Sequence, residues 1–149
     1  MAVGKTSAEV GGYYAKSENK FWNILYELKF TEKKIRSCEY KKILKYNLGL
    51  TDLVKNQLGV DSEIVITQND INELKEKIKK WQPKILAFNG KKPAKTFLDK
   101  NNLRWGKQND EDKIDETEIW VLPSTSGLNT GWTTNNYEMI WKNLYQSIK

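Results

Sequence analysis

Apolar residues recur along the chain with two different periods, which predict helices first and short strands later. The first run with helical spacing consists of Phe21, Ile24, Leu25 and Leu28. This spacing predicts a helix over residues 18–29, with Ser17 as its N-cap. Residues 39–46 predict a second, shorter helix that ends at residues 47–49, an Asn-Leu-Gly sequence of the kind that terminates helices.

A third helix is indicated by a start signal as well as by its apolar residues. Thr67 and Asp70 have the spacing of a capping box, with Asp in the position that more often holds Glu. The stripe that follows at helical spacing consists of Ile71, Leu74, Ile78 and Trp81. Because Pro83 disfavours a helical conformation in the residue before it, we expect the helix to stop there.

After this proline the pattern becomes that of buried strands. Residues 84–88 and residues 119–122 are short, nearly all-apolar runs, as expected of strands that are covered on both faces. Residues 92–99 predict a helix between them, after a turn at residues 89–90, and residues 137–148 predict a closing amphipathic helix.

This alternation of helices and strands predicts the fold class α/β, as a three-layer α/β/α sandwich with a short central parallel sheet. In sheets of this kind, ligands bind outside the carboxyl ends of the strands. We therefore expect the functional site in the loops after Phe88 and after Leu122.

The composition is that of one polar-surfaced domain. With 149 residues, 38% of them hydrophobic, the chain is long enough to bury about two-thirds of its unfolded surface, and we expect a single domain over residues 1–149. No apolar run approaches the roughly 20 residues of a membrane helix, and the N-terminus lacks the apolar region of a secretory signal.

Two residue types that carry much of enzyme chemistry are nearly missing. The chain has no histidine and one cysteine, Cys38. This excludes Ser-His-Asp hydrolases, Cys-His proteases, most zinc enzymes, iron–sulfur clusters and an internal disulfide. We therefore expect chemistry that needs no metal and no cofactor.

The charge of the chain favours a polyanionic partner. Its 25 Lys and Arg against 19 Asp and Glu give a net charge of +6, and nucleic acid is the commonest partner of a basic surface. Its six Trp and seven Tyr lie among the lysines, as suits base stacking beside phosphates, although most of the Trp are equally expected in the core. A solvated, lysine-rich surface without a partner is the alternative.

Four segments share an order and spacing that is more specific than any one of them. They are GGYYAKSENKFW (11–22), LGLTDLVK (48–55), WQPKILAFNGKKPAKTF (81–97) and VLPSTSGLN (121–129). With RWGKQ at residues 104–108, they resemble the mismatch-specific uracil/thymine DNA glycosylases of the uracil-DNA glycosylase superfamily over essentially the whole chain. The resemblance implies the fold of that superfamily and, as partner, double-stranded DNA that contains a mismatched or damaged base. We expect the protein to act as a monomer.

The resemblance also implies roles for the last of these segments. Leu128 matches the wedge residue that fills the hole left by an extruded base; the alternative is that it folds back onto the core. Ser124 stands where related enzymes often carry Asn, beside the base, and Thr130 takes a position commonly held by Arg, which implies weaker contacts to the opposing guanine. The residues expected to approach the phosphates beside the wedge are Ser126, Gly127 and Asn129.

Two residues of the first segment match the base-binding positions of the family. Tyr14 falls where an aromatic ring stacks on the extruded base, and such a ring binds any flat base. Asn19 matches an Asn that braces the loop or lines the pocket. The alternatives are a structural Tyr14, an Asn19 that is only a polar residue in the first turn of a helix, and a neighbouring Tyr13 that belongs to the core.

The sequence departs from the family at the catalytic motif. Ala2 stands where the family's Asn positions the attacking water, and residues 2–5 fit a branch with a Gly-Thr-Ala-Val-Gly-type motif. Asp52 is the candidate substitute, because a fixed carboxylate stabilises the positive charge of glycosidic cleavage or activates water. The alternative is an Asp that caps a helix or braces a loop.

The family's first strand would precede Ala2, in the middle of the parallel sheet. Its loss would leave buried backbone groups unpaired, each at a cost of about 1–3 kcal/mol. We therefore expect that the sequence is a 5′-truncated gene model or a decayed relative.

These inferences lead to one leading function and two alternatives. The leading function is a monofunctional DNA glycosylase of base excision repair, which flips a deaminated or mismatched base, uracil opposite guanine above all, and hydrolyses its N-glycosidic bond without a lyase step. The alternatives are a catalytically inactive relative that binds mismatched or abasic DNA, and an α/β protein with an unrelated function. The compact chain suggests a bacterial-type cytoplasmic, nucleoid-associated setting.

Overall fold

The computed structural model describes residues 13–16, 18–54 and 64–149, which fall into two compact units. The first unit comprises the residues up to Ile64 together with Thr125–Thr130, and the second comprises Val65–Ser124 and Gly131–Lys149. The motif at residues 2–5, which includes Ala2, lies outside the described residues. No helix among those described is long and apolar enough to cross a membrane.

The first unit opens on the helix α2 (Phe21–Glu27), which is shorter than the predicted range of 18–29. Lys20 occupies the N-cap and makes no side-chain cap, whereas the predicted cap, Ser17, lies outside the described residues. Instead, the side-chain oxygen of Asn19 accepts a hydrogen bond from the backbone N–H of Phe21 at 3.0 Å. The apolar face of α2 is buried as predicted, through Phe21, Trp22, Ile24 and Leu25.

The second helix of this unit is a 3-10 helix, η1 (Ser37–Tyr46), which begins two residues before the predicted range of 39–46. Glu39 has non-helical angles, φ −102° and ψ 20°, which kink the helix near its start. Asn47 ends the helix in the left-handed conformation, at φ 57°, as the sequence predicted.

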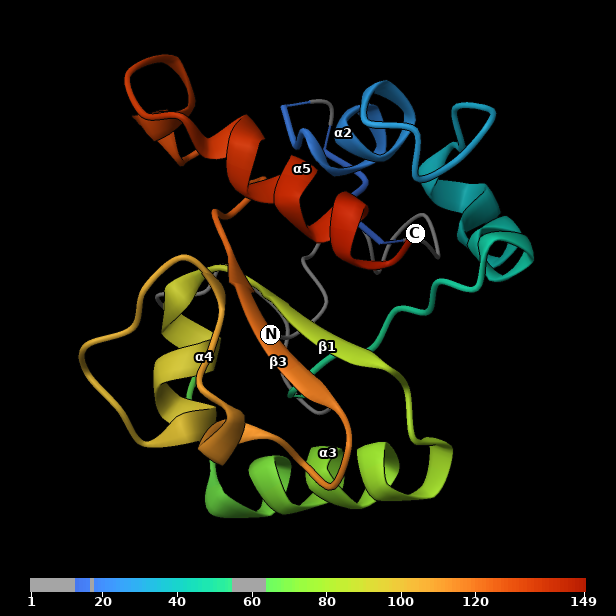
Figure 1. Cartoon of the computed structure of the whole chain (residues 1–149). Helices are drawn as coiled ribbons and strands as arrows, with labels where there is room; N and C mark the ends of the chain where they lie inside the picture. Colours follow the sequence, from blue (N-terminus) through green and yellow to red (C-terminus); the bar gives the residue numbers. More distant parts are fainter. Residues whose placement is uncertain (1–12, 17, 55–63) are drawn as a thin grey trace. The chain divides into compact units, whose positions relative to one another are not determined.

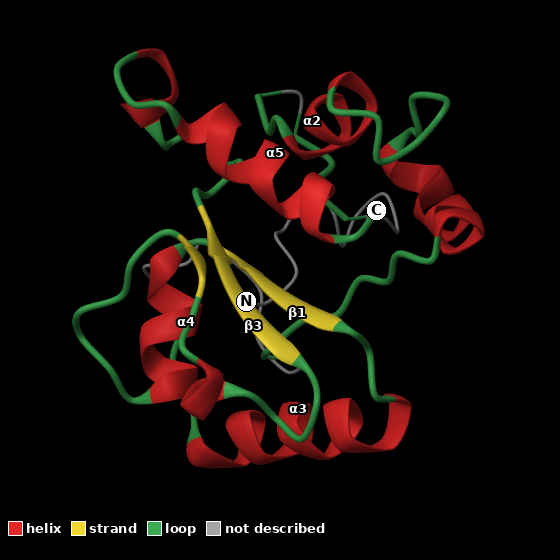
Figure 2. Ribbon diagram, viewed as in Figure 1, coloured by secondary structure: helices red, strands yellow, loops and turns green. Residues whose placement is uncertain are grey.

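The second unit is built on a three-stranded sheet with the order β1-β3-β2, seen in Figures 1 and 2. Strands β1 (Ile85–Asn89) and β3 (Glu118–Leu122) are parallel and joined through the helix α4 (Lys91–Leu98). The short strand β2 (Gly106–Lys107) pairs antiparallel to β3. The predicted fold class, α/β with a parallel strand pair, is confirmed, and the antiparallel edge strand makes the sheet a mixed one.

Helices lie on both sides of the central strand β3. The prediction that residues 84–88 form a strand covered on both faces is wrong, since β1 is an edge strand of the described sheet and its Ala87 is exposed. In Figure 1, the closing helix α5 (Tyr137–Ser147) lies on one side of the long strands, and α3 (Gln68–Trp81) and α4 lie on the other. Because both faces are covered, the consecutive residues 119–122 of β3 are all buried, as their unbroken apolar run predicted. Short 3-10 turns, η3 (Asp110–Asp112) and η4 (Thr130–Thr133), complete the described elements.

The predicted capping box at the start of α3 is confirmed. The Thr67 hydroxyl accepts a hydrogen bond from the backbone N–H of Asp70 at 3.2 Å, and the Asp70 carboxylate accepts one from the backbone N–H of Thr67 at 2.8 Å. At the other end, the prediction that Trp81 belongs to the buried stripe is wrong, since its side chain is 71% exposed. It is the last residue of α3, where Gln82 turns the chain away, and its ring lies beside the Lys80 ammonium.

We expect the substitution Thr67→Ala to lower the free energy of unfolding by about 1 kcal/mol, because the backbone N–H of Asp70 loses its partner, the Thr67 hydroxyl. For a chain of this size, the melting temperature should fall by about 3 °C. Urea and thermal unfolding measure both quantities. The matched control is Thr96→Ala on the exposed side of α4, which should lower neither; equal losses in the two variants would contradict the role of the box.

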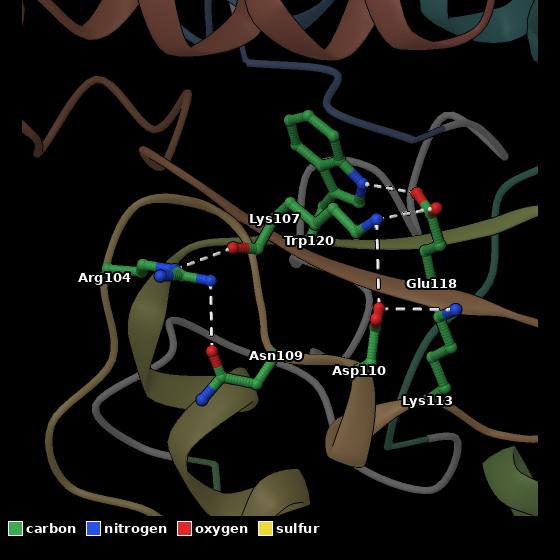
Figure 3. Close-up of polar contacts among 7 residues, drawn as sticks. All are labelled: Arg104, Lys107, Asn109, Asp110, Lys113, Glu118 and Trp120. Atoms are coloured by element: carbon green, nitrogen blue, oxygen red, sulfur yellow. Dashed lines mark hydrogen bonds and ion pairs between the residues drawn. The ribbon is translucent and has the colours of Figure 1, made fainter.

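A network of polar contacts holds the segment after α4 against β3 (Figure 3). Lys107 pairs with Glu118 at 2.9 Å, and Glu118 also accepts a hydrogen bond from the indole of Trp120 at 3.3 Å. The Lys107 ammonium keeps the pKa of Glu118 below its ordinary value. Arg104 donates to the backbone oxygen of Lys107 at 2.9 Å and to the Asn109 side chain at 3.1 Å. Each exposed ion pair of this network adds little to the free energy of unfolding, so the main effect of the network is to order this edge of the sheet.

Candidate functional site

The loops that follow β1 and β3 meet at the carboxyl edge of the sheet, where the topology predicted a site. The backbone N–H of Gly90 donates to the carbonyl oxygen of Leu122 at 2.8 Å. Gly90 has a φ of 120°, which L side chains rarely adopt, so a glycine is required at this turn. Ser124 lies directly beyond it, half-buried, with its side chain facing Gly90.

An aromatic cluster of the second unit, which sequence reasoning did not single out, lies beside this edge. The indole of Trp132 donates to the backbone oxygen of Ser124 at 2.8 Å, and its ring meets that of Tyr137 edge to face. The Trp105 ring also meets the Tyr137 ring edge to face, with a centroid distance of 5.5 Å. The Lys91 ammonium lies 4.2 Å from the centroid of the Trp105 ring. The cluster thereby fixes the backbone that leads away from Ser124. Trp105 lies in the RWGKQ segment, which was the available signal for it.

In the first unit, Tyr14 and Asn19 lie on the loop that leads into α2. Tyr14 is a non-glycine residue with a positive φ of 53°, a conformation that is costly and common at functional sites. Its half-buried ring packs on Phe21, with a centroid distance of 4.1 Å. Because Asn19 caps the backbone of that same Phe21, both residues shape one turn. Their roles in base binding stay predictions.

The loop Thr125–Thr130, which carries the predicted wedge residue Leu128 and is called the wedge loop below, packs on this turn within the first unit. The backbone N–H of Lys20 donates to the oxygen of Thr125 at 2.9 Å, and Thr125 is wholly buried. Gly127 lies so close to Glu18 that a Cβ at this position would come within 2.5 Å of the Glu18 Cβ. The wedge loop and the loop of Tyr14 therefore pack against each other, and no residue larger than glycine fits at position 127.

The tip of the wedge loop presents one apolar side chain. Ser126 folds the loop, since its oxygen atoms accept hydrogen bonds from the backbone of Leu128 and Asn129 at 3.2 and 3.0 Å. Leu128 is 79% exposed, so its side chain does not fold back onto a core as the alternative interpretation required. An exposed leucine on a braced turn has the geometry that a wedge residue needs.

The candidate catalytic residue, Asp52, lies in the same unit and is only 9% exposed. Its charge acts on the neighbouring Tyr13, whose ring meets the Tyr40 ring edge to face at 5.1 Å. The indole of Trp22 donates to the backbone oxygen of Tyr13 at 2.8 Å, which ties this tyrosine to α2. Sequence reasoning offered the core as an alternative for Tyr13; in the structure its side chain is half-buried.

This environment raises the pKa of Tyr13 from 10.0 to about 12. Burial is the largest cause, followed by the negative charge of Asp52 and the hydrogen bond to it. The unfolded chain releases the Tyr13 proton near pH 10, whereas the folded protein keeps it to about pH 12. The associated stability is therefore present below pH 10 and is lost as the pH rises toward 12.

We expect the free energy of unfolding of the wild type to fall more steeply than that of Tyr13→Phe between about pH 9 and about pH 11, because Phe has no proton to retain. Urea unfolding of both proteins at the two pH values gives the difference. Parallel losses would show that Tyr13 titrates in the folded protein as it does in the unfolded chain.

The donors of the site suit acid–base and electrostatic chemistry more than metal binding. Across the residues that the structure describes, no group of three or more His, Cys, Asp or Glu side chains could hold a metal ion. What the first unit offers is a nearly buried carboxylate, Asp52, and an aromatic residue with a positive φ, Tyr14. A buried carboxylate with a defined partner can stabilise a developing positive charge or accept a proton from water.

Comparison with protein families agrees with this geometry. The model of the Uracil DNA glycosylase superfamily matches residues 2–145, which is almost the whole chain. The match covers both compact units, the loop of Tyr14, Asp52 and the wedge loop. It supports a DNA glycosylase-type function and DNA as the partner.

Proposed function

The chain belongs to the uracil DNA glycosylase superfamily, and from this premise we propose that it is a monofunctional DNA glycosylase of base excision repair. The proposed substrate is a deaminated or mismatched base in duplex DNA, uracil opposite guanine above all. The observation that carries the proposal is that a buried carboxylate, Asp52, and an exposed wedge side chain, Leu128, belong to one compact unit. Base excision needs these two features together, one to cleave the bond and one to make it accessible.

The first step is extrusion of the base. A base in a duplex is out of reach of an enzyme, and unstacking it costs a few kcal/mol. Leu128 fills the space that the base leaves, while Ser126, Gly127 and Asn129 bring their backbone to the phosphates. Tyr14 stacks on the extruded base, with Phe21 supporting its ring from behind.

The second step is hydrolysis of the N-glycosidic bond. As the bond between the base and C1′ breaks, its electron pair leaves with the base, and positive charge develops on the sugar. The Asp52 carboxylate stabilises this charge and accepts a proton from the water that attacks C1′. The departing base takes up one proton and Asp52 gives up the one it accepted, so the products are the neutral free base and an abasic site that carries the hydroxyl of the water at C1′.

A second candidate function rests on the motif at residues 2–5, where Ala2 stands in the position of the family's catalytic Asn. Ala2 cannot orient water, and this favours a catalytically inactive relative that binds mismatched or abasic DNA. The same features, Tyr14 and Leu128, serve binding in both cases. The two functions differ only in whether the bond is broken.

The test is excision from end-labelled duplexes that contain uracil, thymine, hypoxanthine or ethenocytosine opposite guanine. After incubation with the purified chain, hot alkali breaks the strand at any abasic site. We expect cleavage of the uracil duplex, and the pattern over the four duplexes gives the lesion preference. Intact strands from a folded sample that still binds these duplexes would support the inactive relative instead.

A further inference from the structure

Two tryptophan side chains hold the backbone that follows β3, at the point where the strand has ended. The indole N–H of Trp141 donates to the carbonyl oxygen of Pro123 at 3.1 Å, and the indole N–H of Trp132 donates to the carbonyl oxygen of Ser124 at 2.8 Å. All four residues belong to the second unit. Two successive carbonyl groups beyond the strand therefore have partners that fix their directions.

These two hydrogen bonds also fix the direction of the Ser124 side chain. Because peptide groups are planar, a held carbonyl group sets the orientation of its whole peptide plane. The two held carbonyls belong to the peptide groups on either side of the Ser124 Cα, so the Cα–Cβ bond of Ser124 has a set direction. That direction is toward Gly90, since the Ser124 Cβ lies 3.5 Å from the place that a Cβ of Gly90 would take. The half-buried Ser124 side chain is thereby held at the carboxyl edge of the sheet, where ligands of α/β proteins bind.

The donors of both hydrogen bonds come from packed segments. A tryptophan side chain has one N–H donor and no acceptor, so its ring must be placed correctly for the bond to form. Trp141 is 3% exposed in α5, and the Trp132 ring meets the Tyr137 ring edge to face with a centroid distance of 5.8 Å. Next to Trp132, a Cβ added to Gly131 would come within 2.6 Å of the Tyr137 ring. The Trp132 indole is therefore held on its own side as firmly as it holds Ser124.

We propose that Trp132 is a positioning residue that holds the Ser124 carbonyl group, so that the Ser124 hydroxyl is presented to the extruded base. The proposal rests on the function proposed above, in which a base leaves the duplex before its bond is cleaved. A hydroxyl group has one donor and two acceptor positions, and the edge of uracil carries both carbonyl oxygens and an N–H. Trp132 acts through Ser124 and does not touch the base.

The first test compares the variants Trp132→Phe, Ser124→Ala and the combination of both. Trp132→Phe keeps an aromatic ring and removes the indole N–H, and we expect the single-turnover rate of uracil excision to fall roughly 3- to 10-fold, as for the loss of one hydrogen bond. Ser124→Ala should slow excision at least as much. The combined variant should be no slower than Ser124→Ala alone, because the indole then has no hydroxyl left to position. The matched control is Trp81→Phe, which removes the same atoms from a side chain that is 71% exposed and should leave the rate unchanged.

The second test uses the wild type alone and needs no activity. Hydrogen exchange of the indole protons, assigned by NMR, should be slower for Trp132 than for the exposed Trp81, because a proton in a hydrogen bond exchanges only when the bond opens. Equal exchange of the two protons would overturn the contact between Trp132 and Ser124.

The outcomes separate this inference from the proposed function. If the wild type excises uracil and Trp132→Phe is equally fast, or if the losses multiply in the combined variant, Trp132 does not act through Ser124 and the glycosylase proposal stands. If the wild type excises no base although the Trp132 indole proton is protected, the glycosylase proposal fails. The dissociation constants of the same three variants for the uracil duplex then decide the positioning role: it requires the same non-additive pattern in affinity, and unchanged affinity or additive losses would overturn it.

Discussion

The substitution Asp52→Asn is expected to slow base excision at least about a hundredfold, the cost of removing a group that stabilises charge in the transition state. Asn has the shape of Asp and keeps one side-chain oxygen, so the fold around it should persist. Only the negative charge is lost, and the developing charge on the sugar loses its partner. Duplex affinity should stay within about twofold, because an interaction made only in the transition state does not contribute to ground-state binding.

Single-turnover excision and equilibrium binding to a uracil duplex measure these two quantities. The control is Asp99→Asn, which changes an exposed aspartate after α4 by the same atoms and should leave both unchanged. Asp99 has a left-handed conformation, which Asn tolerates well, so this control should also keep its stability. Full activity in Asp52→Asn would mean that another group cleaves the bond and that Asp52 only braces its loop.

For the wedge, Leu128→Ala is expected to slow excision from duplex DNA roughly 10- to 100-fold, because the hole left by the base is no longer filled and the base restacks. The same variant should excise uracil from single-stranded DNA at the wild-type rate, since no hole forms there. Its stability should be unchanged, because a side chain that is 79% exposed contributes little to the core.

The natural control is Leu44→Ala, which removes another leucine of the first unit, 64% exposed on η1. It should alter neither duplex nor single-strand excision. Fluorescence of 2-aminopurine placed next to the uracil reports unstacking directly and should rise less with Leu128→Ala than with the wild type. Equal losses on both substrates would show that Leu128 acts in the pocket and not as a wedge.

Elements whose signals lie within a few residues were predictable from the sequence. The capping box of Thr67 and Asp70 sets the start of α3 through hydrogen bonds that span three residues. The apolar runs at 84–88 and 119–122 become the parallel pair β1 and β3. Coverage on both faces was predicted correctly only for β3, since Ala87 of β1 is exposed. The strand β2 has two residues, too few for any periodicity, and its pairing depends on residues 120–121 of another segment.

The site was predictable only in part, for the same reason. Asp52, Tyr14 and Leu128 could be named from motifs, since each lies in a recognisable local segment. Nothing local distinguishes Tyr13 from Tyr14, which are adjacent tyrosines. Trp81 fits the helical stripe, yet its position at the last turn leaves it in solvent.

By itself, the sequence determined the approximate positions of the longer helices and of the strands β1 and β3, which residue types are available for chemistry, and that the chain resembles a DNA glycosylase. These properties depend on the spacing, composition and order of residues, which can be read directly from the linear sequence. The tertiary structure decided that Thr125 bonds to the backbone of Lys20, that Gly127 packs on Glu18, and that Leu128 stays exposed. Such contacts join residues far apart in sequence, and their geometry is set by how whole elements pack.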